Sequence, residues 1–133
     1  MTGDELTRLY DYGYWANDKL LQVVSELTPE EFTQTVAGSY GSIRNTLVHM
    51  LSAEWGWLDR CGGFARGKAL TPDDYPTQQT LVAAWSTLER HMRDFLAALT
   101  DQDLARAVEF TLPGGDRRVM PLGVLMQHAA THG

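Results

Sequence analysis

Apolar residues recur at steps of three and four positions along most of the chain, which is the spacing of amphipathic helices. Thr2 and Glu5 have the spacing of a capping box at the start of the first stripe. Ser42 is a good N-cap for the second stripe, and the glycine pair 62–63 favours a stop after Cys61. The pattern predicts four long helices, over residues 3–27, 43–61 and 78–99 and from Pro121 onward.

The connections between these helices carry turn residues. Segment 28–31, Thr-Pro-Glu-Glu, predicts that the first helix stops and that a short capped helix follows. Segment 64–77 is rich in Pro, Gly and Asp and indicates a loop. Segment 108–112 alternates apolar and polar residues, which predicts a strand or a hairpin closed by Pro-Gly-Gly at 113–115.

The fold that these elements predict is all-α. Segment 27–32 resembles segment 99–104, and each follows a long helix and precedes a connection to another, which makes a faint internal repeat. Four long helices without a regular alternation of strands predict a four-helix bundle. At 133 residues the chain has the size of one domain, so we expect a single domain over residues 1–133.

The composition of the chain limits the classes of partner and the cellular compartment that we expect for the protein. The formal net charge of −6 repels phosphate backbones and anionic lipid, so we expect no nucleic-acid and no membrane partner. No apolar run is long enough to cross a bilayer, and the acidic N-terminus is unlike a signal peptide. The single cysteine, Cys61, suits a reducing cytoplasm, and its surroundings favour a small packed residue over a nucleophile.

Histidines are the main candidates for chemistry, since the chain has no P-loop, dinucleotide fingerprint or His-Glu-x-x-His motif. His128 and His132 are four residues apart, on one face of the last helix, where both imidazoles could bind one cation. His49 lies about 160° from the centre of its helix's apolar stripe. Its helical neighbours are small residues, a pattern that agrees equally with a ligand pocket beside His49 and with a histidine that faces solvent. His91 lies between two arginines and is predicted to be on the surface.

Glu54 is the one carboxylate that falls near the middle of an apolar stripe. It is a weak candidate for a general base, and a buried ion pair or a role in helix packing fits the pattern as well. Tryptophans favour a roomy apolar interior, although such residues more often fill a core than line a pocket. The four are Trp15, Trp55, Trp57 and Trp85.

Three segments spread over the chain resemble the DinB/YfiT-like superfamily of metal-dependent four-helix-bundle proteins. Segment 9–17 ends in Trp-Ala-Asn and is similar to the family's opening helix. Segment 41–50, followed by Glu54, resembles the helix that bears the family's first metal ligand, here His49. Segment 121–133 resembles the start of the last ligand-bearing helix. The resemblance implies a divalent metal (zinc, nickel or iron) held by histidines.

The same resemblance gives a ligand set. In the family's register His49 and His132 are two of three ligands, and the third would fall after Gly133, which predicts that the last helix is truncated. His128 is then a flanking residue of the site. A natural end at Gly133 would instead make His128 the third ligand, and the internal repeat also places His128 opposite His49.

The function that the resemblance implies is metal-dependent chemistry on small molecules. Relatives include enzymes that use low-molecular-weight thiols, so the first hypothesis is a thiol S-transferase whose metal activates the thiolate. One alternative is a metal-dependent hydrolase with Glu54 as general base. Another is a non-enzymatic stress-linked protein that binds a metal or an apolar ligand between its helices. The resemblance also suggests a homodimer, with Trp57 as a candidate interface residue.

Overall fold

A computed structural model describes residues 2–38, 40–62, 65–112 and 114–132. The predicted all-α bundle is confirmed, and each predicted long helix is present with its ends displaced by two residues at most. The elements in chain order are α1 (Gly3–Ser25), α2 (Pro29–Thr33), α3 (Ile43–Cys61), the 3₁₀ turn η1 (Pro72–Asp74), α4 (Gln78–Ala98), α5 (Asp101–Leu104), β1 (Ala107–Thr111), β2 (Arg117–Pro121) and α6 (Leu122–His132).

Short-range hydrogen bonds set the ends of α1 and α3. The Thr2 side chain accepts a hydrogen bond from the Glu5 backbone N–H at 3.1 Å, and Ser42 caps α3 in the same way. Gly62 ends α3 with φ of 88°, a left-handed conformation in which a side chain would be strained. Gly63, the second residue of the predicted stop, lies outside the described residues.

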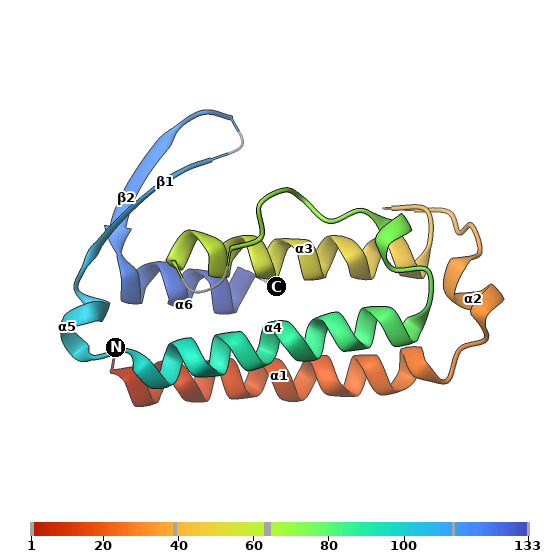
Figure 1. Cartoon of the computed structure of the whole chain (residues 1–133), viewed down its shortest axis with the longest axis horizontal. Coiled ribbons are helices and arrows are strands. Elements are labelled where there is room, and N and C mark those ends of the chain that lie inside the picture. The colour runs from red at the N-terminus through yellow and green to blue at the C-terminus, as the bar shows by residue number, and fades with distance from the viewer. Residues whose placement is uncertain (1, 39, 63–64, 113, 133) are drawn as a thin grey trace.

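The internal repeat corresponds to the two short helices. Thr28 and Thr100 each form a reciprocal capping box at the start of α2 and of α5. Each short helix buries one apolar side chain, Phe32 in α2 and Leu104 in α5. The two helices lie at opposite ends of the bundle (Figure 1). The repeat therefore supplies two similar corners that connect successive long helices.

The four long helices form the sides of the bundle (Figure 1). α1 packs against α4 and α6, and α3 packs against the same two helices. α1 and α3 are therefore diagonal neighbours that face each other across the interior. Side chains from all four helices form one core, which includes Leu6, Leu51, Leu81, Leu122, Leu125 and Met126. Among the described residues no helix combines the length and apolar character that a membrane crossing requires.

The predicted hairpin extends from the α5 end of the bundle (Figure 1). β1 and β2 pair antiparallel, with Ala107 opposite Pro121 and Thr111 opposite Arg117. The prediction that α6 begins at Pro121 is wrong by one residue, because Pro121 still belongs to β2 and the helix starts at Leu122. A proline has no amide to donate to a strand partner, so it is tolerated at this terminal position. Pro113 of the predicted turn lies outside the described residues.

Candidate functional site

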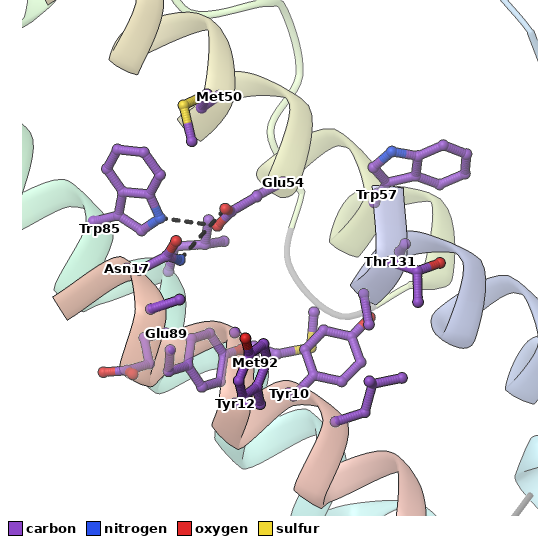
Figure 2. Close-up of a pocket in the computed structure, with 17 residues that line it drawn as sticks. Tyr10, Tyr12, Asn17, Met50, Glu54, Trp57, Trp85, Glu89, Met92 and Thr131 are labelled. Carbon is purple, nitrogen blue, oxygen red and sulfur yellow. Dashed lines mark hydrogen bonds between the residues drawn. The ribbon is translucent and has the colours of Figure 1, made fainter. Parts of the chain in front are cut away.

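A cavity of about 330 Å³ opens between α1, α3, α4 and α6 (Figure 2). This volume is at the lower end of the range of about 300–1,000 Å³ that small-molecule sites occupy. Most of its wall is apolar or aromatic, and two carboxylates, Glu54 and Glu89, also line it. The aromatic residues of the wall are Tyr10, Tyr12, Tyr14, Trp57 and Trp85.

Glu54 projects from α3 toward Trp85 of α4 and Asn17 of α1 (Figure 2). The Trp85 indole N–H donates to Glu54 Oε2 at 2.8 Å. The Asn17 amide donates to Glu54 Oε1 at 3.4 Å, a long hydrogen bond that joins the diagonal helices α1 and α3. One carboxylate therefore connects three of the four long helices at the wall of the cavity.

The surroundings of Glu54 oppose its ionisation. Burial raises the pKa of the Glu54 carboxyl above its usual value of 4.5, while the hydrogen bonds from Trp85 and Asn17 lower it. In the described part of the chain no Lys, Arg or His side chain forms an ion pair with Glu54. Of the two structural roles that the sequence left open, helix packing is therefore the one observed.

The other carboxylate of the wall, Glu89, is held by a cation. Arg93 Nη2 lies 3.4 Å from Glu89 Oε1, and Arg93 Nη1 donates to Asp11 Oδ1 at 2.7 Å. The Arg93 guanidinium also lies over the Tyr14 ring, 4.7 Å from its centroid. This group connects α1 to α4, and the single positive charge of Arg93 is shared between Asp11 and Glu89.

Tyr10 forms the contact between α1 and α6 next to the cavity. Its hydroxyl donates to the Met126 carbonyl at 2.8 Å, and both residues are buried. Burial raises the pKa of the Tyr10 phenol, with a further increase from Cys61 and Glu54. The hydroxyl therefore stays protonated and serves as a fixed donor that positions α6.

The histidines singled out in the sequence have aromatic neighbours. His49 is exposed, as its angle from the apolar stripe predicted, and it stacks on Tyr40 with ring centroids 4.4 Å apart. His128 is also exposed and meets the edge of Trp57 at 5.1 Å. His132 is the last residue of α6, and its side chain lies outside the described part of the structure.

A metal centre is not assembled by the side chains that the structure describes. Within that set, no three His, Cys, Asp or Glu residues come close enough to hold one ion. The predicted site of His49, His132 and His128 stays a prediction, since one of its members is outside the set. His91, predicted to lie on the surface, is half-buried on α4.

Two of the predicted ligands are direct sequence neighbours of residues that line the cavity. His49 directly precedes Met50, and His132 directly follows Thr131. Met50 and Thr131 both line the cavity, from α3 and from α6. Because α3 and α6 pack against each other, the histidine-bearing segments belong to neighbouring walls.

Cys61 has the packed role that the sequence favoured. The residue is 2% exposed, and burial raises the pKa of its thiol to about 12. A thiol with a raised pKa carries little thiolate at neutral pH, so Cys61 lacks the lowered pKa of an activated nucleophile.

Trp57, the candidate interface residue, packs within the chain. Its ring meets Phe110 of β1 edge-on at 6.2 Å, and the Arg60 guanidinium lies 4.7 Å from its centroid. The side chain is half-buried and lines the cavity. These contacts give Trp57 a role within one chain, and the homodimer remains a prediction.

Asn17 and Gly13 are two residues of the site that the sequence analysis did not single out. Asn17 and Gly13 both fall within the apolar stripe of α1, where neither residue type is expected. Asn17 hydrogen bonds to Glu54, and both Asn17 and Gly13 line the cavity. A Cβ atom added at Gly13 would meet nothing within 4 Å, so the glycine borders open space. Exceptions within a hydrophobic stripe therefore point to this cavity.

Comparisons with known proteins agree with the fold and the predicted resemblance. The DinB family model matches residues 1–133. Protein DinB of Bacillus subtilis (strain 168) is 23% identical over 131 residues, which cover 95% of this chain and 76% of that protein. The crystal structure of a DinB-like protein from Bacillus cereus ATCC 10987 superposes with a TM-score of 0.68 at 18% identity, over 93% of this chain and 80% of that one. At this identity the structural likeness shows the fold.

Proposed function

Because the chain belongs to the DinB family, we propose that it is a metal-dependent enzyme that acts on small molecules, and that its reaction is a thiol S-transfer. His49 and His132 are the proposed ligands of the divalent metal, with His128 as the candidate for a third. Neutral imidazole suits zinc, nickel and iron, the metals named for this site. Bound to three imidazoles, such an ion supplies Lewis acidity that lowers the pKa of a bound thiol or water.

The observation that carries the proposal is the position of the cavity beside the histidine-bearing segments. Met50 and Thr131 line the cavity, and each is the direct sequence neighbour of one proposed ligand, His49 or His132. A substrate in the cavity would therefore lie against α3 and α6, the two helices that carry the proposed ligands. Because the wall is mostly apolar, the cavity limits the contact of that substrate with water, which disfavours hydrolysis as a competing reaction.

The chemical step balances without an external oxidant. The sulfur of the thiol forms a bond to an electrophilic carbon of the second substrate, the bond from that carbon to its leaving group breaks, and the thiol proton passes to solvent. The chain's own residues fix the shape of the cavity. Tyr10 holds α6 through the Met126 carbonyl, and Glu54 connects α3 with α4 and α1.

Elemental analysis of the purified protein, after incubation with Zn²⁺, Ni²⁺ or Fe²⁺ and desalting, tests the metal site. We expect one metal ion per chain, lost in His49→Ala and in His132→Ala. His91→Ala is the matched control, since His91 lies on α4 and is not one of the proposed ligands, and it should keep the metal. Failure of all three metals to bind the wild-type protein would overturn the proposal.

A second assay separates the candidate reactions. Cysteine with 1-chloro-2,4-dinitrobenzene reports thiol transfer, and p-nitrophenyl acetate reports hydrolysis. We expect metal-dependent conjugation that disappears in His49→Ala. Hydrolysis without conjugation would favour the hydrolase, and bound metal with neither activity would favour the non-enzymatic binding protein, so both results contradict the transfer reaction.

A further inference from the structure

We propose that the cavity selects a small organic cation, whose ammonium group pairs with Glu54 and whose apolar body lies against the aromatic wall. The inference names the chemical class of ligand for the cavity, and it rests on the proposed function for the idea that this cavity is a substrate site. The binding itself requires no metal, so the two can be tested separately.

Charge complementarity is the first argument. Among the described residues that line the cavity there are two carboxylates and no Lys, Arg or His. Glu89 already has a cationic partner in Arg93, whereas Glu54 has hydrogen bonds only from the neutral donors Trp85 and Asn17. A buried charge normally has a partner of opposite sign. Glu54 is therefore the wall residue for which a ligand would supply the partner of opposite charge.

The hydrogen bonds of Glu54 leave room for such a ligand. A carboxylate has about four lone-pair positions, and the Trp85 and Asn17 donors use one on each oxygen. Burial raises the pKa of Glu54, whereas both donors favour the ionised form, and a bound ammonium group would favour that form further. The desolvation of Glu54 is already incurred when the bundle folds, so a bound ammonium group gains the attraction at a smaller further cost.

The aromatic wall provides the second contribution. Tyr10, Tyr12 and Trp57 stand around the cavity with Trp85 beside Glu54 (Figure 2). The faces of such rings attract cations, and their area favours an apolar body. The polar atoms of Tyr10 and Trp85 are already bonded, to the Met126 carbonyl and to Glu54, so these residues offer mainly ring surface.

Gly13 supplies the space. It lies inside α1, where glycine destabilises a helix relative to alanine, and a Cβ there would meet nothing within 4 Å. A side chain at this position would enter the cavity that Gly13 lines. Helix packing would allow a side chain at this position, so the glycine leaves part of the cavity open that another residue would fill.

Isothermal titration calorimetry with three probes that share a phenylethyl body tests the charge preference: 2-phenylethylammonium, 2-phenylethanol and 3-phenylpropionate. We expect the wild-type protein to bind the cation at least about tenfold more tightly than the alcohol, and the anion least tightly. Equal or tighter binding of the alcohol or the anion would overturn the inference, as would the absence of heat with every probe. This arm requires no variant.

Matched variants locate the interaction. Glu54→Gln should remove the preference for the cation over the alcohol, whereas Glu89→Gln, on the same cavity, should retain it. Gly13→Leu should abolish binding of all three probes, since its side chain enters the cavity. A preference that survives Glu54→Gln, or that Glu89→Gln removes instead, would contradict the assignment to Glu54.

Metal content measured on the same samples separates this inference from the proposed function. Cation-selective binding without any metal would support the cavity assignment while the metal-dependent reaction fails. Stoichiometric metal without cation selectivity would support the metal site of the proposed function and overturn the assignment of the cavity to a cation.

Discussion

The cavity has two carboxylates on its wall that differ in their surroundings. Glu54 lies within the bundle, where it accepts hydrogen bonds from Trp85 and Asn17. Glu89 lies near the surface and pairs with Arg93. Both carboxylates are half-buried, but Glu89 is paired with a cation, whereas Glu54 accepts hydrogen bonds from neutral donors.

The two carboxylates also differ in how well the stability of the fold accounts for their presence. A surface pair such as that of Glu89 gains little stability but costs little to form. Burial of Glu54 disfavours its charge, and an apolar residue at that position would pack the interior without this cost. Positions that break a local rule of the fold are often those that serve function. Glu54 is such a position, and the predictions below test the contrast.

The largest expected effect comes from the buried side. Trp85 is 3% exposed, so Trp85→Ala removes a large buried ring and should lower the free energy of unfolding by about 3–5 kcal/mol. Urea denaturation followed by circular dichroism measures this change. Trp85→Phe keeps most of the ring but removes the donor to Glu54, and it should cost about 1–3 kcal/mol. A cost below about 1 kcal/mol for Trp85→Ala would show that this side is not tightly packed.

The second prediction concerns pH. Burial raises the folded-state pKa of Glu54 above 4.5, so between 4.5 and that raised pKa the folded protein binds more protons than the unfolded one. The contribution of Glu54 is therefore favourable at pH 4.5 and below, and it is lost as the pH rises through the folded pKa. We expect the difference in unfolding free energy, wild type minus Glu54→Gln, to fall over this window.

Urea titrations between pH 4 and pH 8 measure that difference. Taking the difference between two proteins cancels other groups, such as Asp103, whose pKa is lowered by hydrogen bonds from Thr100. Glu89→Gln is the matched control and should keep the wild-type pH dependence, because Glu54 is still present. A flat difference curve for Glu54→Gln would mean that the carboxyl is better solvated than its position indicates.

Local features of the sequence predicted most of the fold. Ser42 and Gly62 set the ends of α3 through contacts within a few residues, and a capping box does the same for each short helix. The unusual position of Glu54 within its stripe was also visible. Its partner Asn17 is 37 residues away, and the contact depends on how α1 and α3 face each other across the bundle. Packing of this kind has no local signature.

The candidate metal site was predicted less completely. The stripe of α3 placed His49 on the exposed side, and the structure agrees. The stacking of His49 on Tyr40 could not be foreseen, because Tyr40 precedes α3 in a connection with no periodic pattern. The ligand role of His132 rests on the resemblance to the family, and it awaits the metal analysis described above.

A smaller effect of opposite sign is expected at Gly13. Gly13→Ala should raise the free energy of unfolding by about 0.5–1 kcal/mol, because alanine favours a helix interior and its Cβ meets open space. The same methyl group should weaken binding of 2-phenylethylammonium. Gly3→Ala is the control, since Gly3 also lies in α1 but does not line the cavity, and it should leave binding unchanged. A more stable Gly13→Ala protein with wild-type binding would show that the open space is not used by the ligand.

The smallest effect is expected at Glu89, the half-buried carboxylate that is paired with a cation. Arg93→Gln removes the cation that Glu89 and Asp11 share, and it should lower the unfolding free energy by less than about 1 kcal/mol, with a smaller change in 0.5 M salt. The variant also leaves Glu89 as an unpaired carboxylate on the cavity wall, as Glu54 is. If burial gives Glu54 its preference for a cation, Glu89 stays screened by water and the affinity for 2-phenylethylammonium should change by less than about twofold. A gain of tenfold would mean that an unpaired carboxylate anywhere on this wall attracts the cation, and that the position of Glu54 between the helices is not what gives the cavity its selectivity.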